Sequence, residues 1–125
     1  MFTHILLGSN DPKRAKQFYD AVMAPLGVGP GFDAGTRVFY RGPNGAFGIG
    51  TPADGEPANH ANGGTVGFAA PDPAAVDAFH AAGLANGGTC EGPPGRRMNA
   101  PGKAYGAYLR DPDGNKICAF AQVKE

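Results

Sequence analysis

The side chain best suited to chemistry in this sequence is that of His4, which lies inside the first apolar run. A neutral imidazole gains or loses a proton near pH 7, so His4 could bind a ligand or transfer a proton. The alternative is an interior histidine that the fold holds by hydrogen bonds. His4 is the one residue for which we predict a catalytic role.

Cys118 and Arg37 are the next residues that could act on or hold a ligand. The Cys118 thiol could be a nucleophile, but no base can be identified beside it, and a free cysteine commonly packs as a small hydrophobe. The Arg37 guanidinium could receive a carboxylate or phosphate, together with Arg96, Arg97 and Lys103, or it could be ordinary surface charge. Both interpretations stay open for each residue.

Composition narrows the classes of partner. The 125 residues predict one compact domain, and a formal net charge of zero without a basic tract argues against nucleic acid as a partner. No apolar run approaches the ~18 residues of a membrane span and no signal peptide is visible, so we expect no membrane partner. Two cysteines do not make a disulfide framework, which favours reduced thiols and a cytoplasmic location.

A pattern in the first half of the sequence recurs in the second half. An apolar run meets Asp-Pro at residues 11–12 and again at 72–73, a shift of 72 − 11 = 61, and a Phe follows each Asp by seven residues. The turns at residues 41–46 and 110–115 also match, with a shift of 110 − 41 = 69. An Asp before Pro is typical of a helix start, because Asp caps the helix and Pro suits its first turn. The repeat predicts two modules of the same construction.

We therefore predict an α+β fold in which each module is a βαβββ unit. Module 1 covers residues 1–51, a linker covers 52–63, and module 2 covers 64–125. The two modules form a curved mixed sheet around a cup, with the helices on its outer face. Helices are expected at 12–23 and 73–82, and strands at 2–8, 28–32, 36–41, 46–51, 65–70, 88–92, 104–110 and 116–122, with a long loop at 92–103.

Alternation along a strand predicts which side chains enter the cup. Leu7 belongs under the first helix, so His4 faces the cup, and the shift of 61 places Thr65 at the matching position of module 2. Cys118 faces the cup from the last strand, and 118 − 69 = 49 makes Ile49 its counterpart in module 1.

The hairpins extend the predicted site. Tyr108 is expected opposite Cys118, and its counterpart Phe39 would then face the cup, as would Arg37 two residues away. A single extra turn residue would reverse these faces. The predicted site is His4 with a set of ligand-binding residues, namely Arg37, Phe39, Ile49, Thr65, Tyr108 and Cys118.

The chain resembles the vicinal oxygen chelate superfamily, which includes glyoxalase I, bleomycin-resistance proteins, fosfomycin-resistance enzymes and extradiol dioxygenases. The matching segments are His4, residues 18–27 (Phe-Tyr-Asp-Ala-Val-Met-Ala-Pro-Leu-Gly), residues 65–68 (Thr-Val-Gly-Phe) and residues 111–115 (Asp-Pro-Asp-Gly-Asn). Together they span almost the whole chain. These segments are specific for the superfamily, but they do not indicate which reaction the protein would catalyse.

The resemblance implies a divalent metal in the cup, held by His or Glu from four strand positions. The first of these histidines is His4, the usual second-half histidine falls on Thr65, the usual carboxylate of the last strand on Cys118, and the remaining position on Ile49. A catalytic zinc needs about three protein ligands, and a non-haem iron site needs two His and one carboxylate. We therefore expect no cofactor, with a divalent metal on non-standard ligands as the alternative.

Several functions remain open. The favoured one is a glyoxalase-like protein that acts on or binds a small oxygenated molecule in the cup without the standard metal site. The alternatives are a metal-free sequestering protein of the bleomycin-resistance type, a metal-dependent lyase or dioxygenase with non-standard ligands, and a scaffold that binds a partner. The resemblance also implies a homodimer, often with the cup built across chains.

Overall fold

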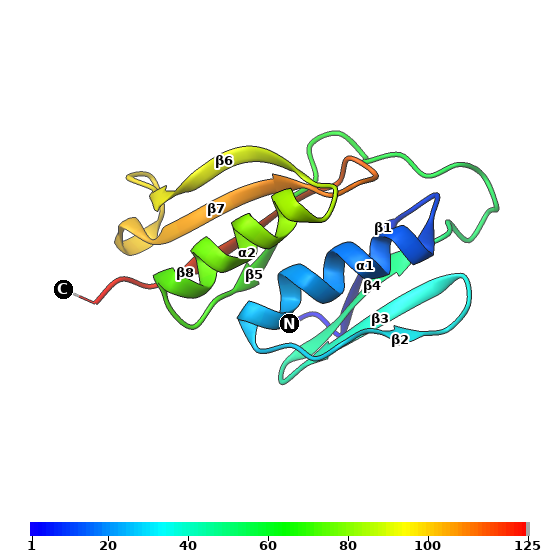
Figure 1. Cartoon of the computed structure of the whole chain (residues 1–125), viewed down its shortest axis with the longest axis horizontal. Coiled ribbons are helices and arrows are strands. Elements are labelled where there is room, and N and C mark those ends of the chain that lie inside the picture. Colours follow the sequence, from blue (N-terminus) through cyan, green and yellow to red (C-terminus); the bar gives the residue numbers. More distant parts are fainter. Residues whose placement is uncertain (125) are drawn as a thin grey trace.

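A computed structural model of the chain describes residues 1–124 and confirms the α+β class with two βαβββ modules (Figure 1). The first module contains β1 (His4–Gly8), α1 (Pro12–Met23), the 3₁₀ turn η1 (Ala24–Leu26), β2 (Phe32–Asp33), β3 (Arg37–Gly42) and β4 (Gly45–Gly50). The second contains β5 (Val66–Ala69), α2 (Pro73–Ala85), β6 (Thr89–Arg96), the 3₁₀ turn η2 (Pro101–Lys103), β7 (Tyr105–Arg110) and β8 (Lys116–Ala121). None of the helices in residues 1–124 is long and apolar enough to cross a membrane.

Both helices begin where the Asp-Pro pattern predicts. The Asp11 side chain accepts a hydrogen bond from the Arg14 backbone N–H at 3.2 Å, and that of Asp72 accepts one from Ala75 at 2.8 Å. These bonds satisfy backbone donors that the first helical turn leaves free. The first helix passes into η1 and stops at Gly27, whose φ of 85° is a left-handed conformation that glycine adopts without strain.

The second helix runs to Ala85, three residues beyond its predicted end at residue 82. Gly83, just after the predicted end, is a packing residue within the helix. A Cβ atom at Gly83 would lie 2.4 Å from Cδ1 of Leu109, so only glycine lets the helix approach β7 this closely. Asn86 caps the C-terminal end of the helix, and Gly87 follows it with a φ of 93°.

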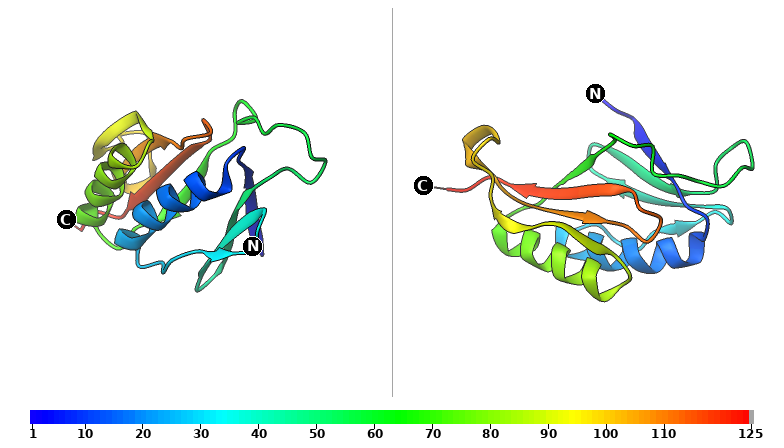
Figure 2. Two further views of the ribbon diagram at one scale, coloured as in Figure 1. Left: turned by 45° about the vertical axis from the view of Figure 1, so that its right-hand side comes forward. Right: turned by 90° about the horizontal axis from the view of Figure 1, so that it is seen from above.

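The two modules place their strands in the same order. Residues 1–124 form one four-stranded sheet in the order β1-β4-β3-β2 and another in the order β5-β8-β7-β6. In each sheet the first strand of the module pairs in parallel with the last, and the remaining pairs are antiparallel. Both helices lie on one side of the strands (Figure 2). We call the opposite side of each sheet its open face.

Several strand boundaries differ from the predicted ones, and those of β6 and β2 differ most. Strand β6 continues through Pro93 and Pro94 to Arg96, although a loop was expected from residue 92. It is an edge strand with register shifts, and such a strand accepts proline because its outer N–H groups need no partner. Strand β2 covers Phe32–Asp33, whereas residues 28–32 were expected.

One hydrophobic core takes side chains from both modules. Phe18, Tyr19 and Val22 of α1 pack in the same cluster as Leu109 of β7 and Ile117 of β8, and all five are fully buried. The Tyr19 hydroxyl donates to the Asp111 carboxylate at 2.6 Å, which ties α1 to the turn between β7 and β8. This arrangement fixes both sheets around the paired helices.

Candidate functional site

The register of the first sheet separates its open face from its core face. Leu7 pairs with Ile49, and Ile49 pairs with Val38, so these three side chains share the face that packs against the helix. The neighbouring row consists of Leu6, Gly48 and Phe39 and lies on the open face. His4 and Arg37 lie on that open face as well, in the rows on either side.

The placement of Ile49 in the cup is therefore wrong. Its side chain is 0% exposed and belongs to the core. The reason is one extra residue in the second hairpin, where Arg110 pairs with Lys116, whereas in the first hairpin Arg41 pairs with Ala46. The shift between β4 and β8 is consequently 70, and 118 − 70 = 48 makes Gly48 the counterpart of Cys118.

The second sheet places Tyr108, Cys118 and Gly67 in one row of its open face. Cys118 is only 5% exposed, and burial raises the pKa of its thiol to about 11, against a smaller opposing effect of the nearby Lys116 ammonium. The thiol is thus protonated at neutral pH. Because the thiolate is the form that attacks electrophiles and binds metals, Cys118 is suited to packing rather than to either role.

Tyr108 is surrounded by cations that sequence reasoning did not connect with it. The Lys116 ammonium lies 5.1 Å and the Arg97 guanidinium carbon 5.6 Å from the ring centroid. The Phe120 ring meets Tyr108 edge-on, with centroids 5.7 Å apart. Contacts of this kind stabilise cations against the ring face, so Tyr108 presents an aromatic surface with a positive rim.

His4 is exposed and lies at the mouth of a groove between the edge strands β1 and β5. The groove has a volume of about 640 Å³, and its walls are mostly apolar, including Phe47 and Phe68, whose rings touch with centroids 5.1 Å apart. The Nδ1 atom of His4 lies 2.8 Å from the Thr3 hydroxyl. Thr65 is exposed one residue before β5 begins, and it does not line this groove.

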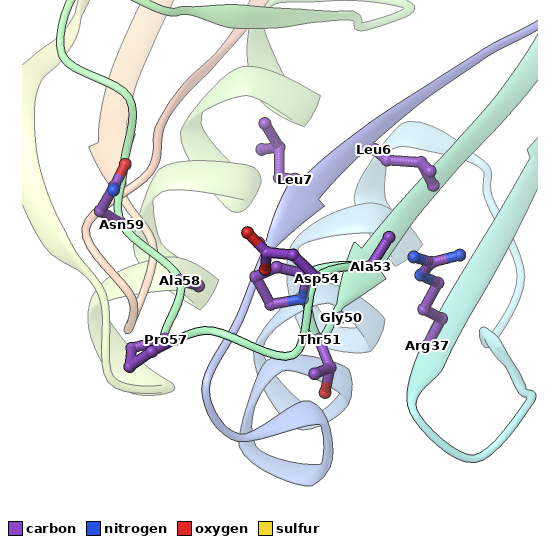
Figure 3. Close-up of a pocket in the computed structure, with 12 residues that line it drawn as sticks. Leu6, Leu7, Arg37, Gly50, Thr51, Ala53, Asp54, Pro57, Ala58 and Asn59 are labelled. Atoms are coloured by element: carbon purple, nitrogen blue, oxygen red, sulfur yellow. The ribbon is translucent and has the colours of Figure 1, made fainter.

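Arg37 lines a second cavity, of about 410 Å³, at the opposite end of the first sheet (Figure 3). This cavity, which we call the linker cavity, lies between the ends of β1 and β4 and residues 51–59. The linker is fixed there by two hydrogen bonds between Asn10 and Ala58, at 3.2 Å from the Asn10 amide to the Ala58 carbonyl and 2.7 Å from the Ala58 N–H to the Asn10 side-chain oxygen. Sequence reasoning treated the linker only as a boundary.

The structure brings the predicted residues together in two groups rather than one. His4, Phe39 and Arg37 share the open face of the first sheet, and Tyr108 and Cys118 share that of the second. The groove contains His4 alone of the predicted site residues, and the linker cavity contains Arg37 alone.

Glycines are the functional-site feature that sequence reasoning missed. A Cβ atom at Gly48 would lie 2.3 Å from Leu6 and 2.9 Å from Phe39, and one at Gly106 would lie 2.5 Å from the Phe120 ring. Large side chains therefore lie flat across these glycines on the open faces. The alternate glycines at residues 48 and 50 were the available signal, since a side chain every second residue would occupy this face.

The residues at the four strand positions do not fit a divalent metal site. His4 is a standard ligand, but the other positions carry Gly48, the hydroxyl of Thr65 and the buried, protonated thiol of Cys118. Zinc, iron and similar ions need about three nitrogen, sulfur or carboxylate donors. Within residues 1–124, no three His, Cys, Asp or Glu side chains gather where one ion could be held.

Comparison with known proteins identifies close relatives of this architecture. A model of the Glyoxalase/Bleomycin resistance protein/Dioxygenase superfamily matches residues 1–119. The crystal structure of a glyoxalase/bleomycin resistance protein from Albidiferax ferrireducens T118 has 57% sequence identity and a TM-score of 0.90, over 98% of this chain and 99% of that one. No curated protein matches the chain.

More distant structures share the fold. A lactoylglutathione lyase from Agrobacterium tumefaciens is 23% identical with a TM-score of 0.67, over 97% of this chain and 92% of that one. The fosfomycin resistance protein FosX from Mesorhizobium loti is 14% identical with a TM-score of 0.68, over 98% and 92% of the two chains. At these identities the likeness concerns the arrangement of helices and strands.

Proposed function

Because the chain belongs to the glyoxalase/bleomycin resistance protein/dioxygenase superfamily, we propose that it binds a small oxygenated molecule in the cup without a metal ion. The single observation that carries this proposal is the donor set at the four strand positions. Only His4 among them is a standard metal ligand, and Gly48 offers no side chain at all. For a ligand in the groove, polar contact then comes from His4 and ring contact from Phe47 and Phe68; contact with Thr65, Phe39 or Tyr108 requires a ligand that extends beyond the groove.

The shape of the groove favours binding over catalysis. Its walls carry Phe47, Phe68 and other apolar side chains, while His4 provides a polar group at its mouth. Pockets of this kind hold small organic molecules through apolar contact and use a few polar groups for orientation. No nucleophile–base pair is found among the predicted site residues, since Cys118 is buried and protonated. Sequestration of a small molecule, as in the bleomycin-resistance branch, is the function that these features support best.

A homodimer is part of the proposal. Strands β1 and β5 are both edge strands, and exposed apolar side chains lie beside β1 or on its open face, with Phe2 65% and Leu6 43% exposed. Unpaired strand edges and exposed apolar side chains of this size favour association with another chain. A second copy that covers these surfaces would complete the cup from two chains.

The cysteines support a reducing compartment. Cys90 is exposed and Cys118 buried, and both are free thiols. Exposed free thiols persist where disulfide formation is suppressed, so we place the protein in the cytoplasm.

The proposal is tested by binding to protein from which metal has been removed. Protein dialysed against EDTA is mixed with small neutral oxygenated compounds, with catechol as the first probe, and its thermal midpoint is measured. We expect binders to raise the midpoint as much as in untreated protein, since a ligand selective for the folded state stabilises it. The shift should be smaller in His4→Ala and unchanged in the control His60→Ala. A shift that requires added zinc, nickel, iron or manganese would contradict metal-free binding.

A further inference from the structure

The linker cavity is separate from the groove that contains His4, and two opposite charges line it. Its volume of about 410 Å³ suits a ligand of a few heavy atoms. Arg37 contributes a cation from β3, and Asp54 contributes an anion from the linker. Leu6 and Leu7 of β1 also line the cavity, and Figure 3 shows their side chains on opposite sides of the strand.

The Arg37 guanidinium is available to a ligand. It makes no hydrogen bond or ion pair with any other residue in the described part of the chain, residues 1–124. Its position depends on Gly50, because a Cβ atom there would lie 2.7 Å from Cγ of Arg37. The glycine lets the arginine stem lie flat on the sheet while its charged end reaches the cavity.

The Asp54 carboxylate is held at the same cavity but does not neutralise Arg37. It accepts a hydrogen bond from the Glu56 backbone N–H at 2.9 Å, and no cation within residues 1–124 forms an ion pair with it. In Figure 3 the Asp54 carboxylate and the Arg37 guanidinium lie on either side of Ala53. The hydrogen bond fixes the direction of the loop and leaves acceptor capacity on the carboxylate.

The wall that carries Asp54 is anchored to the fold. Asn10 binds Ala58 through both its side-chain oxygen and its amide, and a Cβ atom at Gly8 would lie 2.8 Å from that of Ala58. The linker therefore packs directly on the end of β1. The anchor at Ala58 lies four residues from Asp54, whose own loop is held by the hydrogen bond from the Glu56 N–H. A wall that is ordered before binding lowers the entropy cost of recognition.

We propose that the linker cavity binds a small aliphatic amino acid as its zwitterion. The ligand carboxylate pairs with Arg37, the ligand ammonium with Asp54, and the aliphatic side chain packs on Leu6, which shares the open face with Arg37. A ligand with one charge would leave the other protein charge without a partner, so the cavity selects against it. This inference rests on the proposed function only in that the chain binds small molecules.

The test is a titration of ¹⁵N-labelled protein followed by NMR. The probes are L-leucine, 4-methylpentanoate, which lacks the amine, and isoamylamine, which lacks the carboxylate; catechol is the neutral probe. We expect leucine to shift the amide signals of Leu6, Gly50 and Ala53 and to bind at least ~10-fold more tightly than either single-charge analogue. Arg37→Gln should abolish the preference for leucine over isoamylamine, and Asp54→Asn the preference for leucine over 4-methylpentanoate.

Two control variants carry the same chemical changes outside the cavity. Arg41→Gln lies on the same strand and face as Arg37, and Glu56→Gln lies in the same loop as Asp54; neither side chain lines the cavity. Both should bind leucine like the wild type. Equal binding of leucine and 4-methylpentanoate, or binding unaffected by Arg37→Gln, would overturn the inference. Binding of catechol without leucine would overturn it while the proposed function stands, and no binding of any probe would contradict both.

Discussion

The Asp111 carboxylate accepts four hydrogen bonds, from the Tyr19 hydroxyl, the side-chain amide and backbone N–H of Asn115, and the backbone N–H of Asp113. Burial raises the pKa of this carboxyl, and the hydrogen bonds oppose that effect. Burial, followed by the neighbouring Asp111 charge, also raises the pKa of Tyr19. At the scale of residues, the Asp-Pro-Asp-Gly-Asn sequence therefore forms the turn of the last hairpin and, through Asp111 and Tyr19, connects that hairpin to α1.

Loss of the Asp111 carboxylate should destabilise the fold. Asp111→Ala leaves the buried Tyr19 hydroxyl and Asn115 amide without their acceptor, and we expect it to cost about 3 kcal/mol in the free energy of unfolding. Tyr19→Phe removes one bond and should cost about 1–2 kcal/mol. Urea unfolding measures both. Asp33→Ala, in an exposed turn, is the control, and equal effects of Asp33→Ala and Asp111→Ala would refute this role.

His80 should make stability depend on pH. Burial lowers its pKa below the ordinary value of 6.5, against a smaller opposing effect of Asp77, and its buried Nε2 atom has no hydrogen-bond partner among residues 1–124. The His80 imidazole therefore takes up a proton near pH 6.5 in the unfolded chain and only at lower pH in the folded chain. Because the unfolded state binds more protons in this range, the free energy of unfolding falls as the pH drops. Unfolding free energies at pH 7.5 and 5.5 should differ less in His80→Gln than in the wild type or in the exposed control His60→Gln. An unchanged difference in His80→Gln would count against this explanation.

At the scale of elements, the features that could be predicted from the sequence are those that depend on residues close together in the chain. The Asp-Pro starts of α1 and α2 could be predicted, because a cap and a first-turn proline act within four residues. The face of β4 could not, because one extra residue in the second hairpin changes the shift from 69 to 70 and moves Ile49 into the core. The extension of β6 through Pro93 and Pro94 could not be predicted either, because a strand accepts prolines only at a sheet edge and the edge position follows from the tertiary structure. The linker cavity depends on contacts between Asn10 and Ala58, 48 residues apart in sequence.

Gly83 provides a test of packing between α2 and the second sheet. Replacing a helical glycine with alanine normally stabilises a helix by about 1 kcal/mol. Here the new Cβ atom would lie 2.4 Å from Leu109, so we expect Gly83→Ala to destabilise the protein by about 1–3 kcal/mol. Thermal or urea unfolding gives the value. In a Leu109→Ala background the same change should be neutral or stabilising, and a destabilisation of equal size in both backgrounds would exclude the contact as its cause.

At the scale of the whole molecule, the proposal requires a second chain. Light scattering during size-exclusion chromatography at micromolar concentration should give twice the chain mass of 12.7 kDa. The exposed Phe2 beside β1 is expected to contribute, so Phe2→Ser should shift the equilibrium towards monomer. A mass of one chain at every concentration tested would contradict the dimer.

The most direct test of the central claim is the metal content of the purified protein. The four strand positions carry His4, a glycine, a threonine hydroxyl and a protonated thiol, which cannot supply the donors that a divalent ion needs. After dialysis, elemental analysis by mass spectrometry should find zinc, nickel, iron and manganese far below one equivalent per chain. A near-stoichiometric amount of any of them, retained by the wild type and lost in His4→Ala, would contradict the account.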